Sequence, residues 1–212
     1  GNSTIDDCHN LGEIYVGLNA SFTRMQIGGI IGISQLNTMT ISNSTNNAPI
    51  TVKGSTWGTD NGRLMVGGIA GQGGANFKDC DNLAGGAILI TEGTFAQIND
   101  NVSFTIAGCV GVNNSSSMAF TVDGLKNYAP VTMKDIVYTA KNDDTIPTIQ
   151  VAGVMGYSNI VKEGSYVKNL YNEGKITVRH YGQSSRVGGL VGYMKTSMLG
   201  TEEAPLWNAG DL

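Results

Sequence analysis

Short stretches in which apolar and polar residues alternate recur along the whole chain, separated by clusters of small and polar residues. In one region the alternation covers residues 40–43, 49–53 and 65–70. A period of two residues is typical of a strand with one buried face. Clusters of Asn, Gly, Asp and Ser are typical of turns. The pattern therefore predicts three short strands in each such region, and no segment has a long helical period.

Two sequence blocks repeat along the chain at nearly constant spacing. The first reads IGGIIG, VGGIAG, IAGCVG, VAGVMG and VGGLVG, and its key glycine falls at Gly29, Gly68, Gly108, Gly153 and Gly189, with spacings of 39, 40, 45 and 36 residues. The second block has an asparagine followed two residues later by Gly or Ala, and this asparagine falls at Asn10, Asn46, Asn82, Asn127, Asn172 and Asn208. Self-similarity at such a period indicates a stacked repeat architecture.

Three strands per repeat, with equivalent positions stacked, describe an all-β parallel β-helix in which each repeat forms one coil. Each coil buries its apolar face only against its neighbours, so residues 1–212 are expected to form a single domain of about five to six coils, each a repeat of 36–45 residues. Two coils of about 18 residues per repeat remain an alternative. One inner ladder is expected at Ile14, Ile50, Ile88, Val131 and Ile176, and another at Ile30, Ile69, Cys109, Val154 and Leu190.

The asparagine column has two interpretations. Stacked asparagines can bond to one another along the axis of a solenoid and hold a turn, or they can form a polar stripe that binds a ligand. Because the column coincides with the turn before each strand, the structural interpretation is favoured.

Composition and charge argue against several classes of partner and site. The net charge is -4, and the 13 Lys and Arg residues are scattered, which argues against nucleic acid as a partner. No apolar run approaches the ~20 residues of a membrane helix, so direct membrane insertion is not expected. Cys8, Cys80 and Cys109 lack metal-site spacing and are interpreted as small buried apolar residues. Neither a metal site nor a cofactor is predicted.

The segments VGGLVGYM at 187–194 and LYNEGKITV at 170–178 resemble the GLUG-type repeat of bacterial secreted and cell-surface proteins. The resemblance covers nearly the whole chain and is loosest at 95–150, where Ala107 and Ala152 replace a glycine of the block. It implies a right-handed β-helix and an extracellular or bacterial cell-surface location. It also implies a repetitive surface protein, often an adhesin or the non-catalytic part of a larger secreted enzyme, and it implies no catalytic residues.

Loops between the strands are where a solenoid is expected to carry function. The loop KGSTWGTDNGR places Trp57 near Asp60, Asn61 and Arg63, an aromatic face beside planar hydrogen-bonding groups that suits a sugar ring. The alternative is that Trp57 folds down to cover the coil. A second loop, RHYGQSSR, offers a base without a nearby acid pair. The segments INDN at 98–101 and KNDD at 141–144 carry Asp100, Asp143 and Asp144, which suit calcium as oxygen ligands, but turn chemistry is the favoured interpretation of both segments.

These features together predict a non-catalytic, surface-exposed β-helix module that acts as an adhesin or rigid stalk and binds a glycan or a host surface protein. The alternative is a carbohydrate-active β-helix enzyme, a polysaccharide lyase or glycoside hydrolase, or its sugar-binding part. Both ends of the sequence fall within a repeat, so flanking repeats of the same chain are expected as further partners.

Overall fold

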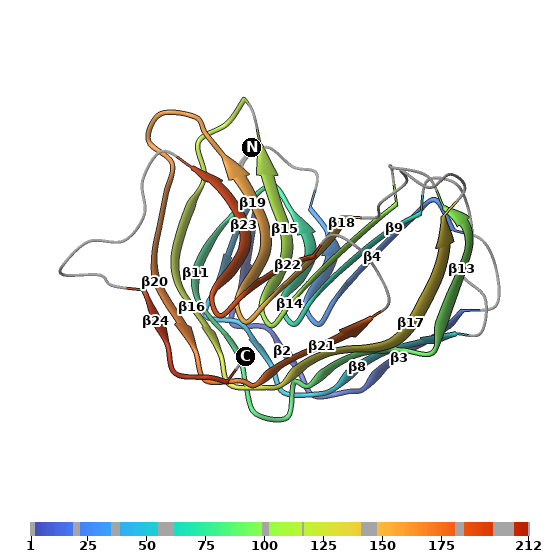
Figure 1. The fold of residues 1–212 in the computed structure, drawn as a ribbon. Helices are drawn as coiled ribbons and strands as arrows, with labels where there is room; N and C mark the ends of the chain where they lie inside the picture. The colour runs from blue at the N-terminus through green and yellow to red at the C-terminus, as the bar shows by residue number, and fades with distance from the viewer. Residues whose placement is uncertain are drawn as a thin grey trace.

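The structure is a computed structural model that describes residues 3–18, 22–34, 39–54, 62–98, 102–115, 117–140, 148–180, 185–196 and 206–211. These residues form parallel strands joined by turns and contain no helix, which confirms the all-β prediction. The strands belong to four sheets, designated A to D in the order in which the chain first enters them (Figure 1).

Each sheet collects strands from successive repeats. Sheet A holds β1 (Ser3–Asp6), β2 (His9–Asn10), β6 (Met39–Ser42), β7 (Thr45–Asn46), β11 (Ala75–Asn82), β16 (Thr121–Asn127), β20 (Tyr166–Asn172) and β24 (Trp207–Asn208). Sheet B holds β3 (Ile14–Leu18), β8 (Ile50–Gly54), β12 (Ile88–Thr91), β13 (Gly93–Ile98), β17 (Val131–Ala140) and β21 (Ile176–His180). Sheet C holds β4 (Arg24–Gly28), β9 (Arg63–Gly67), β14 (Ser103–Ala107), β18 (Thr148–Ala152) and β22 (Ser185–Gly188). Sheet D holds β5 (Ile31–Ile33), β10 (Ala70–Gly73), β15 (Val110–Ser115), β19 (Met155–Ile160) and β23 (Val191–Thr196).

The chain passes through sheets A, B, C and D in the same order in every repeat. Each strand pairs in parallel with its equivalent in the neighbouring repeat, so that Ile50, for example, lies between Ile14 and Ile88. Because parallel in-register strands lie about 4.8 Å apart, residues that are 36 to 45 positions apart in the sequence become neighbours.

The prediction of three strands per repeat is wrong, because the glycine block is a corner between two strands and not part of one. The expected strand at 65–70 is divided: β9 ends at Gly67 and β10 begins at Ala70. A Cβ atom on Gly68 would overlap the carbonyl oxygen of Gly108 and the side-chain amide of Asn82. Only a residue without a side chain fits there, and the backbone turns at this point from sheet C into sheet D.

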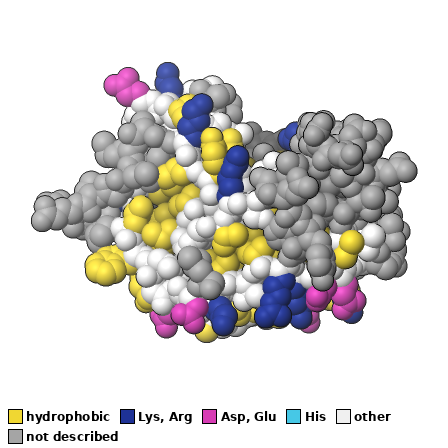
Figure 2. All heavy atoms as spheres, viewed as in Figure 1, with side chains coloured by type: hydrophobic (Ala, Val, Ile, Leu, Met, Phe, Trp, Pro, Cys, Tyr) yellow, Lys and Arg dark blue, Asp and Glu magenta, His cyan; other side chains and the backbone are white. Residues whose placement is uncertain are grey.

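The corner divides the interior into two hydrophobic cores. One lies between sheets B and C and includes Ile50, Val66 and Ile88, and the other lies between sheets A and D and includes Phe77 and Ile69. Figure 2 shows both as separate hydrophobic areas on the face toward the viewer, one between β20 and β23 and one between β21 and β22. The two expected inner ladders are confirmed, since the first lies in one core and the second in the other.

The six repeated asparagines form a continuous row between the two cores. Each side-chain amide donates to the next asparagine's Oδ1, at 2.7 Å from Asn10 to Asn46 and at 2.8 Å for each later pair through Asn82, Asn127, Asn172 and Asn208. Asn46, Asn82, Asn127 and Asn172 are fully buried. Each key glycine of the corner faces an asparagine of this row. The glycine block and the asparagine block therefore meet between the two hydrophobic cores.

The cysteines divide into two groups, and the interpretation of all three as buried is wrong for Cys8. Cys80 and Cys109 are buried, and burial raises the pKa of the Cys80 thiol to about 11. Cys8 is exposed although it occupies the same repeat position as Cys80. The reason is its place near β1, at the edge of sheet A, where a neighbouring strand lies on one side only within the described chain.

Candidate ligand-binding groove

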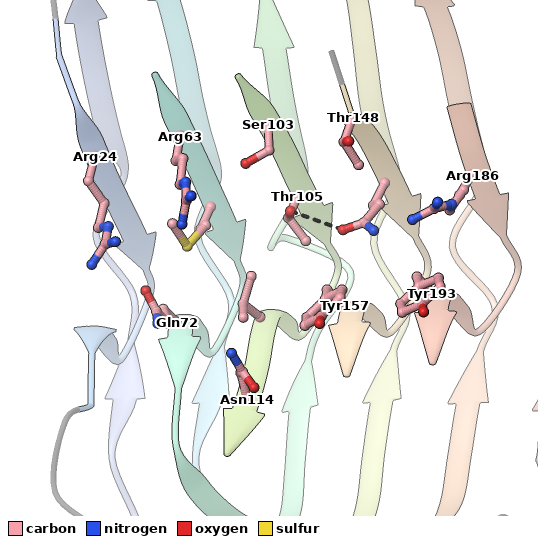
Figure 3. Close-up of a pocket in the computed structure, with 13 residues that line it drawn as sticks. Arg24, Arg63, Gln72, Ser103, Thr105, Asn114, Thr148, Tyr157, Arg186 and Tyr193 are labelled. Carbon is pink, nitrogen blue, oxygen red and sulfur yellow. Dashed lines mark hydrogen bonds between the residues drawn. The ribbon is translucent and has the colours of Figure 1, made fainter. Parts of the chain in front are cut away.

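A groove of about 450 Å³ runs along the stack on the outer side of the corner, where sheets C and D diverge. It is lined by Arg24, Arg63, Met65, Ser103, Thr105, Thr148, Gln150 and Arg186 from sheet C, and by Gln72, Val112, Asn114, Tyr157 and Tyr193 from sheet D. Figure 3 shows these side chains on the two walls, with the arginines on one wall and the two tyrosines on the other. The groove crosses all five strands of sheet C.

Strand register explains which residues line the groove. On the wall from sheet C, one row runs Arg24, Arg63, Ser103, Thr148, and the next runs Gln26, Met65, Thr105, Gln150, Arg186. On the wall from sheet D, the matching row runs Ile33, Gln72, Val112, Tyr157, Tyr193. Alternation along each strand directs these rows outward, while the residues between them, such as Val66, point into the core.

Three arginines give the groove a positive charge on a protein whose net charge is -4. Arg24 and Arg63 are partners on adjacent strands. Arg186 lies three strands beyond β9, roughly 14 Å along the stack. The thirteen lining residues include no carboxylate. Guanidinium groups bind carboxylate, sulfate and phosphate through paired N–H donors, so the groove suits an anionic ligand.

Two tyrosines form an ordered aromatic surface at the other end of the groove. The rings of Tyr157 and Tyr193 are stacked, with centroids 5.4 Å apart and planes at 8°. The guanidinium of Arg186 lies 4.6 Å from the centroid of the Tyr193 ring, within cation–π range. Burial raises the pKa of the Tyr157 hydroxyl, and Tyr193 adds to this effect while Arg186 opposes it. The Tyr157 hydroxyl is therefore protonated at neutral pH.

Hydrogen bonds hold polar side chains of the groove in place before any ligand arrives. The Gln26 amide donates to Gln72 Oε1 at 2.8 Å and so connects the two walls. Thr105 Oγ1 donates to Gln150 Oε1 at 3.3 Å, within sheet C (Figure 3). Preorganised groups lose less entropy on binding. The groove therefore combines fixed amides and hydroxyls with cationic and aromatic groups.

The groove lining lacks the residues that acid–base hydrolysis of a glycosidic bond uses. Glycoside hydrolysis uses a pair of carboxyl groups on either side of the bond that breaks, and the lining residues include neither Asp, Glu nor His. In the described part of the chain, no three His, Cys, Asp or Glu side chains are grouped so that they could hold a metal ion.

The predicted sugar-binding loop is only partly placed. Trp57, Asp60 and Asn61 lie outside the described residues, as do the possible calcium ligands Asp100, Asp143 and Asp144. Arg63 is described and exposed at the start of β9, where the structure brings it beside Arg24 and Ser103 on the groove wall. Of the loop RHYGQSSR, Arg186 lines the groove and Arg179 is exposed on β21.

Sequence reasoning missed most of the groove, although a signal for it was present. Relative to the key glycine, the arginines at 24 and 63 fall five positions before it, Arg186 falls three before it, and Tyr157 and Tyr193 fall four after it. Reading the repeats in columns from that glycine places these residues in adjacent rows. The error about strand number hid this signal, because it left sheet D out of the expected coil.

Comparison of the chain with protein-family models, with curated proteins and with solved structures gives no match. Within the residues that the structure describes, no helix is long and apolar enough to cross a membrane.

Proposed function

We propose that this chain is a non-catalytic binding module that holds an extended anionic glycan in the groove between sheets C and D. The observation that carries the proposal is that Arg24, Arg63 and Arg186 all line a groove whose lining residues include no carboxylate. A linear polymer that lies along the stack would place successive acidic groups against successive strands. Several weak contacts to one chain then act together and raise the apparent affinity.

The proposed architecture is a right-handed parallel β-helix with one repeat per coil, built of GLUG-type repeats. The constant order of sheets A to D and the parallel pairing of each strand with the next repeat support a coil. Parallel crossover connections are right-handed in about 98% of cases, which supports the handedness. A rigid solenoid would present the groove as a fixed surface, as an adhesin or stalk outside a bacterial cell requires.

Removing the groove arginines tests the proposal. The triple variant Arg24→Gln, Arg63→Gln, Arg186→Gln is expected to bind polygalacturonate at least tenfold more weakly than the unchanged chain, because each change removes a charge-assisted contact. The three side chains line an open groove, so the fold is expected to persist. Binding is measured by isothermal titration at two salt concentrations, and the affinity of the unchanged chain should fall at the higher one.

A matched control removes the same charge elsewhere. The triple variant Lys162→Gln, Lys175→Gln, Arg179→Gln also loses three positive charges, from exposed positions that do not line the groove. It should bind polygalacturonate within about twofold of the unchanged chain. Equal losses in the two variants would mean that net charge alone attracts the polymer, and the groove would then not be the binding site. Alginate and heparin serve as further anionic polymers, and methyl-esterified pectin serves as the neutral comparison.

A second candidate function is that this chain itself cleaves the same polymer, as a polysaccharide lyase. The contact between Arg186 and Tyr193 favours it, because a lyase needs a cation near the uronate carboxylate and a base that removes a ring proton. The raised pKa of Tyr157 argues against that residue as the base. Cleavage by elimination creates a carbon–carbon double bond in the product, so ultraviolet absorbance during the titration separates the two functions. Binding without new absorbance supports the binding module.

A further inference from the structure

A second cavity lies on the outer face of sheet A, away from the groove. It has a volume of about 450 Å³ and is lined by Asp79, Gly124, Lys126, Tyr128, Asn169, Leu170, Tyr171 and Trp207. Its volume falls within the range of small-molecule sites. Because sheets A and D lie on opposite sides of one hydrophobic core, this cavity and the groove face different directions.

Three aromatic rings form the apolar surface of this cavity. Tyr171 and Trp207 are partners on the adjacent strands β20 and β24, and Trp207 is 62% exposed. The ring of Tyr128 lies 5.6 Å from that of Tyr171, tilted by 48°. The Tyr171 hydroxyl donates to Glu173 Oε2 at 3.1 Å, which fixes the orientation of its ring. Exposing a tryptophan to water forgoes the free energy of burying it, so a bound apolar surface at this place would recover that free energy.

Gly124 is the one residue without a side chain in a row of turn residues that passes through the cavity lining. Turn residues of sheet A occupy the left-handed region of backbone conformation at Asp7, Asn43, Asp79, Gly124 and Asn169. Strand register places these residues in one row across successive strands. Asp and Asn adopt this conformation in four rungs, so the turn itself does not require glycine. At Gly124 the row has no side chain, and a Cβ there would come within 2.6 Å of Asp79 Oδ1.

Polar groups surround the aromatic rings. Asp79 and Asn169 are exposed on either side of Gly124, and Lys126 lies on the strand next to Tyr171. The Asn169 amide donates to Asp123 Oδ1 at 2.6 Å, which holds the Asn169 side chain in one orientation. A sugar ring has an apolar face that stacks on aromatic rings and hydroxyls that pair with carboxylate, amide and ammonium groups. A proline-rich peptide also binds aromatic surfaces, but it offers few donors for a carboxylate such as Asp79.

We infer that this aromatic cavity on sheet A is a second binding site, specific for a neutral sugar ring. Tyr171 and Trp207 would stack against the apolar face of the ring, and the polar groups at Asp79 and Asn169 would read its hydroxyls. The inference does not depend on the anionic ligand of the groove, because none of the groove residues lines this cavity.

Tryptophan fluorescence offers a direct test, since the chain has two tryptophans, Trp57 and Trp207. In a Trp57→Phe background the emission reports Trp207 alone. The probes are neutral hexasaccharides of glucose, mannose, galactose, xylose and N-acetylglucosamine. At least one of them is expected to change the emission in a saturable manner, and an emission unchanged by all five would overturn the inference.

Two variants and one control locate the binding. The variant Trp207→Ala, followed by calorimetry, is expected to weaken binding of that sugar roughly tenfold, because aromatic residues dominate such contacts. The variant Gly124→Asn introduces the residue that stands at the same turn position at 43 and 169. Its Cβ would displace the Asp79 carboxylate, so it should weaken binding while the fold persists. The control Tyr15→Ala removes an aromatic side chain that is 61% exposed on sheet B.

The Tyr15→Ala control should bind the sugar as the unchanged chain does. An equal loss in Tyr15→Ala and Trp207→Ala would overturn the inference, as would saturable binding of a proline-rich peptide in place of every sugar. The triple arginine variant of the groove should keep its neutral-sugar binding. A failure of the groove proposal is thereby distinguished from a failure at the aromatic cavity.

Discussion

Replacing Ile69 with aspartate is expected to unfold its own repeat and the repeats next to it. Ile69 is fully buried in the core between sheets A and D, and its backbone N–H donates to Cys109 while its carbonyl accepts from Ile30. An unpaired carboxylate at this point would cost more than about 4 kcal/mol of unfolding free energy, because nothing in the core replaces its hydration. Urea unfolding followed by circular dichroism should show a large fall in the midpoint or no folded state at all.

The conservative variant Ile69→Val is the control. It removes one methylene from the same site and should cost only about 0.5–1.5 kcal/mol. If Ile69→Asp unfolded at the same urea concentration as the unchanged chain, the residue would have to face solvent. The division of the interior into two cores would then be wrong.

Replacing Asn82 with alanine is expected to produce the second large loss of stability. Asn82 donates to Asn127 Oδ1 at 2.8 Å and to the Gly86 carbonyl at 3.0 Å, and it accepts from Asn46 at 2.8 Å. All three bonds disappear in the variant, and the buried groups that they satisfied have no water to replace them. The expected cost is about 2–4 kcal/mol. The same urea titration measures it.

Asn10→Ala tests whether burial within the row, and not asparagine itself, sets this cost. Asn10 stands at one end of the row, is only partly buried, and donates to Asn46 Oδ1 at 2.7 Å. Water can take its place at that end, so the loss should be about 1 kcal/mol or less. If Asn10→Ala and Asn82→Ala lost the same unfolding free energy, the claim that exclusion of water stabilises the row would be contradicted.

Much of the fold follows from the sequence because the same two blocks recur every 36 to 45 residues. The glycine block and the asparagine block were each visible as a repeat, and alternation predicted the inner ladders through Ile50 and Ile69. What the sequence did not reveal is that the two blocks touch. That contact exists because Gly68 leaves room for Asn82, and the two residues lie in different strands.

The groove was harder to predict, for a physical reason. Its members are ordinary outward-facing residues that show no local pattern, and only register brings Arg24 to Arg63 and Tyr157 to Tyr193. The corner at Gly68 creates the concave surface, because sheets C and D diverge there. Without that turn, the alternating residues on either side of it would be expected on one flat face. The sequence instead predicts chemistry in the longer segments between strands, such as the one that contains Trp57.

Nuclear magnetic resonance mapping of the bound polymer tests the central claim most directly. A ¹⁵N-labelled sample is titrated with a galacturonate oligosaccharide while the backbone amide shifts are followed. We predict that the largest changes follow the rows of the groove, at Met65, Thr105 and Gln150 on one wall and at Tyr157 on the other. Changes centred on the outer face of sheet B around Tyr15, with the groove amides unmoved, would contradict the account.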